Sequence, residues 1–357
     1  MNVGGIETVL MEVYRNIDKK KYSFDFVVHD KKENVYEKEI NMHGGKLYRM
    51  DFFSKHPIRF LRQFNKLLVE HPEYKIIHIH TTYSIMLPYA LLGKLKGRKI
   101  IIHSHNAYSS PKRAVVHKIL KNYFNSLADY RVACSDLAAQ WMFPEKNMND
   151  VFYWYNAFEL SRFEFDKEIR ESIRKKYGAN NKFVIGNVGR LSYQKNQGLL
   201  IDIFLEVQKK YDNAILWIIG DGEDRKKLEK RVIDLHIQEK VIFMGNQKNI
   251  EKYLYAMDVY VCTSRYEGLG VSLVEAQTSG LPVVTKQQRI SRMTKIVDNY
   301  IAIDEKASIS KWIEEIMKYQ DYDKDRKESY KLVSSSKFNI EVWIKYVELF
   351  YQKVAKD

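Results

Sequence analysis

Short apolar runs alternate with helical patterns along the whole chain, and this alternation constrains the fold more than any other feature. The runs are four to six residues long and rich in Val, Ile and Phe, which is typical of buried strands in a parallel sheet. They form two series, one from residues 24–28 to 151–155 and one from 183–186 to 282–285. Strands alternating with helices predict doubly wound sheets, and two series predict two Rossmann-like domains.

The end of the first series marks the predicted domain boundary. We predict an N-terminal Rossmann-like domain over residues 1–157, a second over 158–335, and a C-terminal helical segment over 336–357. In the last segment, residues 340–354 place aromatic and aliphatic side chains on one broad face, as a helix packed against a core does. With 357 residues, of which 45% are hydrophobic, the chain can bury two cores of ordinary size.

The N-terminus departs from the pattern of a doubly wound domain. Gly4 and Gly5 look like the turn that follows a first strand, yet only Met-Asn-Val precedes them. We therefore expect that the first strand of this domain is missing from the sequence. The upstream genomic region should then encode, in frame, an apolar β-branched run of about five or six residues. A natural truncation is the alternative, and it would favour a protein without catalytic activity.

The charge of the chain is uneven. The net charge is +14, and residues 1–157 carry 24 Lys and Arg against 15 Asp and Glu. Residues 111–127 interleave basic with apolar side chains, which predicts a basic amphipathic helix. An anionic membrane surface and ordinary solvent exposure explain such a helix equally well. Nucleic acid is not an expected partner, because no nucleic-acid-binding motif accompanies the charge.

The sequence predicts a cytoplasmic protein, with the inner face of the membrane as the place where a basic helix would bind. It contains no run of about 18 apolar residues that could span a bilayer, and its start lacks the pattern of a secretory signal. The two cysteines, Cys134 and Cys262, each end an apolar strand-like run. We interpret them as buried, reduced thiols rather than a disulfide.

Two carboxylates, Glu267 and Glu275, flank the strongest candidate site. The apolar run 259–263 reads as a strand that ends just before Glu267, and a helix begins at about Val271. Glu275 then lies one turn into that helix. Gly268 and Gly270 make a tight turn, and the backbone N–H groups of Leu269, Gly270 and Val271 lie at the positive end of the helix dipole. An anion site between two hydroxyl-accepting carboxylates suits a sugar nucleotide; the alternative is two solvated Glu residues.

Two further segments could contact phosphate. Arg190 and Lys195 follow the strand-like run that starts at residue 183, and two cations at a strand tip suit a diphosphate leaving group. Two solvated surface cations are the alternative. The Gly4-Gly5 turn opens a helix and could bring backbone N–H groups close to a phosphate.

Histidines gather at the ends of two strand-like runs of the first domain. His105 lies just beyond the run that ends at His103, where it could contact a sugar hydroxyl; a satisfied core imidazole is the alternative, and it is favoured for His78 and His80. No metal site is predicted, because no nearby Cys or carboxylate completes a ligand set. The Asp-x-Asp string of residues 321–323 lies in a charged segment and reads as solvated.

These motifs, in this order and spacing, resemble the retaining GT-B glycosyltransferases of the group 1 (family 4) class, in particular bacterial capsule and exopolysaccharide transferases. The likeness rests on the Gly4-Gly5-Ile-Glu-Thr start, on His-Ser-His-Asn at 103–106, on the loop from Gly189 to Lys195, on Gly-Asp-Gly at 220–222, and on Glu267 with Glu275. It covers nearly the whole chain.

The resemblance implies an acceptor-binding first domain, a nucleotide-sugar-binding second domain and a C-terminal helix that returns to the first. It implies transfer with retention at the anomeric carbon. No metal or other cofactor is expected, because Arg190, Lys195 and helix N-termini can neutralise the diphosphate. Residue by residue, it gives the diphosphate to Arg190 and Lys195, the ribose to Glu275 and the donor sugar to Glu267. His105 would then lie beside the reacting sugar, and Gly5 would cap the phosphates. With the basic first domain, it makes a lipid-linked saccharide the expected acceptor.

Two other function classes compete with a transferase. A dinucleotide-dependent oxidoreductase would show Gly-x-Gly-x-x-Gly after its first strand, with an acidic residue about 20 positions later, and this pattern is absent. A catalytically inactive GT-B-shaped accessory protein would bind a partner transferase or a glycan. The motif residues argue against that class, and the expected loss of the first strand argues for it.

Overall fold

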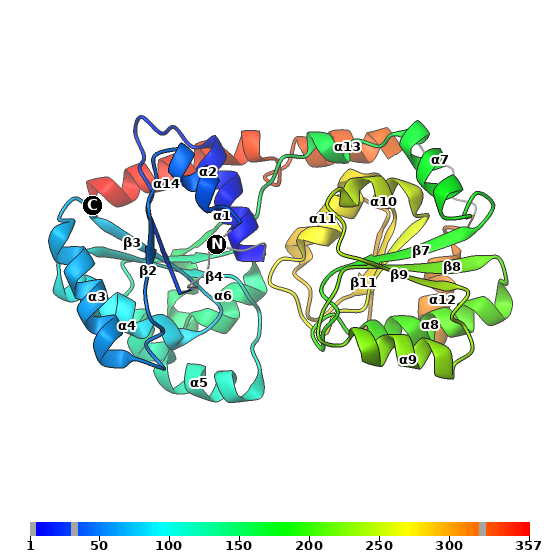
Figure 1. The fold of residues 1–357 in the computed structure, drawn as a ribbon, viewed down its shortest axis with the longest axis horizontal. Helices are drawn as coiled ribbons and strands as arrows, with labels where there is room; N and C mark the ends of the chain where they lie inside the picture. Colours follow the sequence, from blue (N-terminus) through cyan, green and yellow to red (C-terminus); the bar gives the residue numbers. More distant parts are fainter. Residues whose placement is uncertain (1–4, 30–34, 321–325) are drawn as a thin grey trace. The chain divides into compact units, whose positions relative to one another are not determined.

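A computed structural model describes residues 5–29, 35–320 and 326–357, which fold into two α/β units (Figure 1). The first unit comprises Met1–Glu159 and Asn339–Asp357, and the second comprises Leu160–Phe338. Every strand pairing within the three sheets is parallel. The predicted α/β class with two Rossmann-like domains is therefore confirmed.

The second unit holds a six-stranded sheet in the order β12-β11-β10-β7-β8-β9. Its strands are β7 (Phe183–Val188), β8 (Ala214–Ile219), β9 (Val241–Gly245), β10 (Val259–Cys262), β11 (Val283–Lys286) and β12 (Tyr300–Ile303). Its helices are α7 (Lys167–Lys176), α8 (Gln197–Lys210), α9 (Arg225–Asp234), α10 (Ile250–Ala256), α11 (Val271–Thr278), α12 (Ile309–Met317) and α13 (Arg326–Ser334). The strand order reverses between β7 and β10, and ligands of doubly wound sheets bind at such a point.

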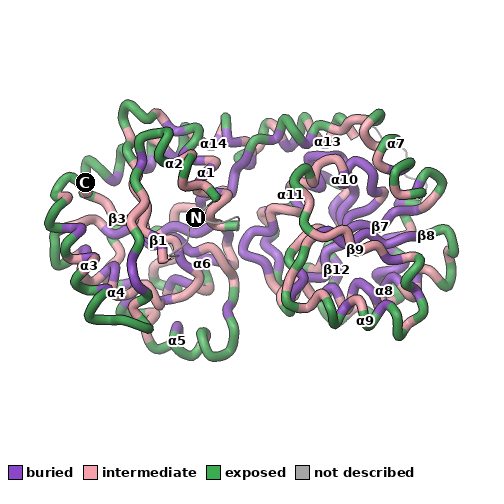
Figure 2. Tube along the Cα trace, in the orientation of Figure 1, coloured by how far each residue is buried: buried purple, intermediate pink, exposed green. Residues whose placement is uncertain are grey.

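The core of this unit explains why its strands read as unbroken apolar runs. All six residues of β8 and all four of β10 are buried, so both faces of each strand are covered by helices. Figure 2 shows these central strands as buried, with exposed residues gathered on the surrounding helices. Each large side chain buried in this way stabilises the fold by roughly 1.5–3 kcal/mol.

Across its described residues, the first unit contains two sheets. β3 (Ile76–Thr81), β4 (Lys99–Ser104), β5 (Tyr130–Ala133) and β6 (Val151–Tyr153) form one, in that order, and β1 (Phe26–Val28) pairs with β2 (Leu47–Arg49) in the other. The helices are α1 (Gly5–Asn16), α2 (Glu37–Met42), α3 (Pro57–Glu70), α4 (Leu87–Leu95), α5 (Pro111–Ser126), α6 (Asp136–Met142) and α14 (Ile340–Lys356).

A cavity of about 920 Å³ is lined by residues of both sheets of the first unit, including Phe26 from β1 and Ile77, His78 and His80 from β3. Within the described residues, β1 and β3 are not neighbours in a sheet. The expected first strand would precede Gly4 and Gly5, and so concerns positions outside the described part of the chain.

The last helix, α14, packs into the core of the first unit. Trp343, Val347 and Phe350 are buried there together with Trp154. The chain returns to the first unit at Asn339, just before α14, where Asn339 forms a parallel β-bridge with Phe158. Tyr351 of α14 also hydrogen-bonds a histidine of β3, 273 residues away in the chain. In Figure 1 this helix, in red, lies beside the blue and cyan elements.

α5 carries an exposed apolar surface, as its interleaved sequence suggests. Val115 and Ile119 are 61% and 73% exposed, and Val116 and Tyr123 are exposed as well. No helix in the described ranges is long and apolar enough to cross a bilayer. Both cysteines are buried and free, as predicted.

Candidate functional site

Two loops at the reversal point of the second sheet are tied to each other. β7 and β10 are parallel neighbours, so the loops that follow them, 189–196 and 263–270, leave the same edge of the sheet. The backbone N–H of Arg265 donates to the carbonyl of Gln194 at 2.7 Å. The Gln194 amide donates to the carbonyl of Tyr266 at 3.1 Å. These bonds hold the Lys195 and Glu267 segments in one arrangement.

Lys195 and Glu267 form an ion pair between these loops. Lys195 Nζ lies 2.7 Å from Glu267 Oε1, and the two side chains are 20% and 7% exposed. Ser264 Oγ donates to the same carboxylate oxygen at 2.5 Å. Burial disfavours the charged ammonium, but the adjacent carboxylate outweighs it and raises the pKa of Lys195 above its ordinary value. The site therefore holds a permanent, oriented cation.

Glycines make room for this arrangement. A Cβ at Gly189 would lie 3.1 Å from Lys195 Cε, so a side chain there would crowd the extended Lys195. Gly270 caps the start of α11 in the left-handed region, with φ of 80°. A Cβ at Gly270 would also approach Leu273 Cδ1 to 2.9 Å. Glycine adopts this conformation without the steric cost that other residues incur.

Glu275 lies on α11, partly exposed, and its pKa is raised to about 7. The main cause is the loss of solvation, which disfavours the charged carboxylate. The positive charges of Arg162 and Lys195 act in the opposite direction and lower its pKa. Arg162 lies 113 residues before Glu275, and no local sequence pattern connects the two. Sequence reasoning missed it for that reason.

The start of α11 lies between the two carboxylates in the chain. Val271 is the first helical residue, and Gly268, Leu269 and Gly270 form the approach to it. The first N–H groups of an α-helix have no partner within the helix, and the helix dipole makes this end positive. With the Lys195 ammonium nearby, the arrangement can bind a diphosphate while carboxylates accept hydrogen bonds from hydroxyl groups.

Arg190 lies at the surface rather than in the ion pair of Lys195. Its side chain is 74% exposed, and its Nε donates to Glu223 at 2.9 Å. The Arg190 carbonyl accepts from the Gln197 amide at 3.1 Å, which orders the loop after β7. A cation this exposed can swing toward an incoming anion at little cost, because a surface pair of this kind contributes about 0–1 kcal/mol.

His105 of the first unit follows β4 and contacts a second histidine. Its Nε2 lies 2.8 Å from His80 Nδ1, and its ring stacks on His103 with centroids 4.0 Å apart. Burial lowers the pKa of His105 to about 3, so its imidazole is neutral at pH 7. Gly5 is the first residue of α1, whereas Gly4 and residues 321–323 lie outside the described residues.

A satisfied core imidazole does not describe His103, and it describes His78 only in part. His103 is fully buried, yet within the described part of the chain neither ring nitrogen has a hydrogen-bond partner. His78 Nε2 is also buried and unpartnered there. His80 contacts His105, a link that sequence reasoning did not anticipate. The register of β3 and β4, which sets His80 opposite His103, brings these rings together.

Two family descriptions match the chain, one over each series of strands. Residues 3–162 match Glycosyltransferase Family 4, and residues 169–332 match Glycosyl transferases group 1. The two matched segments are consecutive and do not overlap.

Individual proteins are similar over long stretches. The glycosyltransferase-named protein EpsF of Bacillus subtilis (strain 168) is 28% identical over 329 residues, covering 88% of this chain and 84% of EpsF. An Escherichia coli protein named UDP-Gal:alpha-D-GlcNAc-diphosphoundecaprenol alpha-1,3-galactosyltransferase is 25% identical, covering 61% of this chain and 59% of that protein. Anabaena Alr3699/HepE, crystallised with UDP and glucose, superposes with a TM-score of 0.78 at 19% identity, covering 98% and 96%. The last likeness establishes the fold.

Proposed function

This chain belongs to the glycosyltransferases that join a family 4 domain to a group 1 domain, and on that premise we propose a specific transfer. The chain moves a sugar from a nucleotide-diphosphate donor to a lipid-linked saccharide, with retention at the anomeric carbon, in capsule or exopolysaccharide synthesis. The observation that carries the donor part is the nearly buried Lys195–Glu267 pair beside the loop that leads into α11, with Glu275 on that helix.

In this proposal the donor is held by groups of matching chemistry. Lys195, Arg190 and the N–H groups of Leu269, Gly270 and Val271 bind the diphosphate, because they supply positive charge and donors. Glu275 accepts hydrogen bonds from the ribose diol, and Glu267, with Gly268 beside it, contacts the donor sugar. For the first unit, the family resemblance of the sequence motifs is the basis for giving Gly5 the role of capping the phosphates and His105 the role of contacting the reacting sugar.

The chemical step follows from where charge develops. The bond between the anomeric carbon and the diphosphate oxygen breaks, and that oxygen keeps the electron pair. The acceptor hydroxyl forms the new bond on the same face, and its proton passes to the departing phosphate oxygen. Cations and N–H groups that already point at the diphosphate stabilise this charge without reorganising. We propose that side chains supply this neutralisation in place of a divalent metal.

The acceptor part of the proposal rests on the surface of the first unit. α5 presents Val115 and Ile119 to solvent on a helix that also carries Lys112, Arg113 and Lys118. Exposed apolar side chains among cations suit the headgroup region of an anionic bilayer. The name of the Escherichia coli relative specifies a diphosphoundecaprenol acceptor for that protein. We therefore propose the inner face of the membrane as the place of transfer.

A donor screen tests the proposal. Purified protein is incubated with a panel of nucleotide sugars, and both thermal stabilisation and release of nucleoside diphosphate are measured. At least one donor should raise the melting temperature, because a ligand that binds only the native state stabilises it. The same donor should be hydrolysed slowly in water and consumed faster with a lipid-linked acceptor. Binding without turnover under either condition would support the inactive accessory protein instead.

A further inference from the structure

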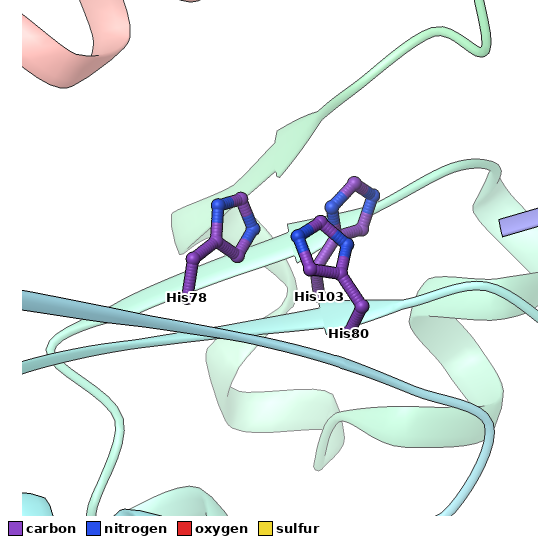
Figure 3. A group of neighbouring side chains, drawn as sticks. All are labelled: His78, His80 and His103. Carbon is purple, nitrogen blue, oxygen red and sulfur yellow. The ribbon is translucent and has the colours of Figure 1, made fainter. Parts of the chain in front are cut away.

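A cluster of histidines inside the first unit has a composition and geometry that the transfer reaction does not use. His78 and His80 alternate along β3, and His103 lies opposite His80 on β4. Figure 3 shows the three rings on the same side of the two strands. One ring nitrogen from each can be chosen so that all three lie within 4.8 Å of one another.

The unpartnered nitrogens distinguish this cluster from structural histidines. Elsewhere in the same unit, His117 is buried with both ring nitrogens paired, Nδ1 with Ser84 Oγ at 2.8 Å and Nε2 with the Trp141 carbonyl at 2.9 Å. His103 is 0% exposed and, within the described residues, has no partner at either nitrogen. A buried polar atom without a partner costs about 1–3 kcal/mol, so a native fold normally supplies one.

The contacts of the other two rings match those of metal-bound imidazoles. A histidine that ligates through one nitrogen usually donates the N–H of the other to a nearby acceptor, which sets its tautomer. His78 Nδ1 contacts Tyr351 Oη at 2.7 Å, and His78 Nε2 is unpartnered. His80 Nδ1 contacts His105 Nε2 at 2.8 Å, which leaves His80 Nε2 as its ligand atom. The non-ligating nitrogens of His78 and His80 therefore each already have a hydrogen-bond partner.

From these contacts, we propose that His78, His80 and His103 bind one Zn²⁺-like ion. The ligating atoms are Nε2 of His78, Nε2 of His80 and a ring nitrogen of His103. An all-imidazole set suits Zn²⁺, Co²⁺, Ni²⁺ or Cu²⁺, whereas Mg²⁺ and Ca²⁺ require oxygen ligands. His78 and His80 line the cavity of about 920 Å³, which provides an entry path and a place for water as the fourth ligand.

The rings must close slightly to bind the ion. Bonds of about 2.0–2.1 Å in a tetrahedral site place ligand nitrogens roughly 3.4 Å apart, which is less than the present spread. The rings must also turn, because they are now close to parallel, with interplanar angles of 26° between His78 and His80 and 22° between His78 and His103.

The ion would also fix the tautomer of His105. With metal on His80 Nε2, the Nδ1 proton of His80 is donated to His105 Nε2, so His105 carries its own proton on Nδ1. The metal is thus bound to a positioning residue, one ring removed from the sugar contact in the proposed function. Metal binding depends only on the three histidines and does not require the transfer reaction.

Metal binding by the full chain, with any affinity tag removed, tests the site. After treatment with a chelator, Co²⁺ is titrated and the visible band of tetrahedral cobalt is recorded. Zn²⁺ affinity is then measured by competition with a chromophoric chelator. We expect one equivalent of tight binding, and an affinity at least tenfold weaker in His103→Gln and in His78→Gln. Tyr351→Phe should weaken binding about tenfold through the lost outer contact.

His71→Gln is the matched control, because His71 belongs to the same unit but contacts Tyr48 and Glu73. Its Zn²⁺ affinity should equal that of the unaltered protein. Thermal denaturation without metal establishes that each variant folds. If His103→Gln does not fold, the affinities of His78→Gln and Tyr351→Phe for Zn²⁺ test the site instead. Absence of a stoichiometric site in the unaltered protein, or unchanged affinity in the folded cluster variants, would overturn the proposal.

Discussion

The ammonium of Lys195 lies 2.7 Å from the carboxylate of Glu267, although 72 residues separate them in the chain. Each residue comes from a loop beyond a strand of the same sheet, and the pairing of β7 with β10 makes the two loops neighbours. The pair is nearly buried, so it orients one cation at the start of α11 without the mobility of a surface lysine. In the proposed donor site, Lys195 anchors the diphosphate.

Replacing Lys195 by Ala should weaken nucleotide-sugar binding or turnover by at least tenfold, which corresponds to about 1.4 kcal/mol. The variant removes the fixed cation and leaves Glu267 as an unpaired, nearly buried carboxylate. Steady-state kinetics and a donor titration measure the loss. Lys209→Ala is the control, because Lys209 forms an exposed ion pair with Glu206 in the same unit. Equal kinetics in both variants would contradict the assignment of Lys195.

Glu275→Ala should likewise reduce donor binding or turnover at least tenfold, since it removes the proposed ribose acceptor. In the unaltered protein, donor affinity should rise between pH 6 and pH 8. The raised pKa, about 7, means that the hydrogen-bond-accepting carboxylate becomes dominant only in that range. Glu275→Gln should bind weakly and without this rise. A rise of the same size in the Gln variant would show that another group titrates.

The same pKa predicts an opposite effect on the stability of the free protein. Because the folded pKa of Glu275 is raised above the ordinary value of 4.5, the folded state holds the proton more tightly than the unfolded state. The resulting stability is fully present below about pH 4.5 and is lost as pH rises through about 7. The Glu275→Gln variant does not lose stability in this way, because the Gln side chain does not ionise. The melting temperature of Glu275→Gln, relative to that of the unaltered protein, should therefore increase from pH 5 to pH 8. A difference in melting temperature that stays constant over this range would refute the prediction.

Sugar transfer should not require Mg²⁺ or Mn²⁺, because the proposed cations at the diphosphate are side chains. After chelation and removal of the chelator, added Mg²⁺ or Mn²⁺ should leave the rate of nucleoside diphosphate release unchanged. Strong stimulation by Mn²⁺ would point to an oxygen-ligand metal at the donor. Stimulation by Zn²⁺ alone would implicate the histidine cluster of the first unit instead.

Anionic vesicles should bind the protein at low salt and release it as salt rises, because the attraction is screened. Ile119→Glu, on the exposed face of α5, should weaken this binding several-fold in a sedimentation assay. Ile233→Glu is the matched control, since Ile233 is 59% exposed on α9 of the other unit. Equal binding to neutral and anionic vesicles, or equal loss in both variants, would remove the membrane part of the proposal.

Local patterns in the sequence were sufficient for the class of fold. Runs such as residues 214–219 are apolar throughout because both faces of β8 are buried, and burial of that kind is visible in six consecutive residues. The helix over Ile340–Lys356 is likewise visible in its spacing of aromatic residues. Strand β12 was missed, since Tyr300–Ile303 includes an exposed position and gives no clear apolar run. The hydrophobic pattern of a segment reflects which of its faces are buried. The class of fold follows from the order of such segments along the chain.

Tertiary structure alone decided which of the marked residues meet. The sequence by itself determined that Lys195 and Glu267 follow strands, but the reversal of strand order at β7 decided that they form a pair. Arg162 reaches the electrostatic environment of Glu275 only through packing. His78 and His80 of β3 were interpreted as ordinary core residues, but strand register sets His80 opposite His103 and α14 brings Tyr351 to His78. The physical reason is that register and packing depend on contacts between segments far apart in the chain, and no local pattern encodes them.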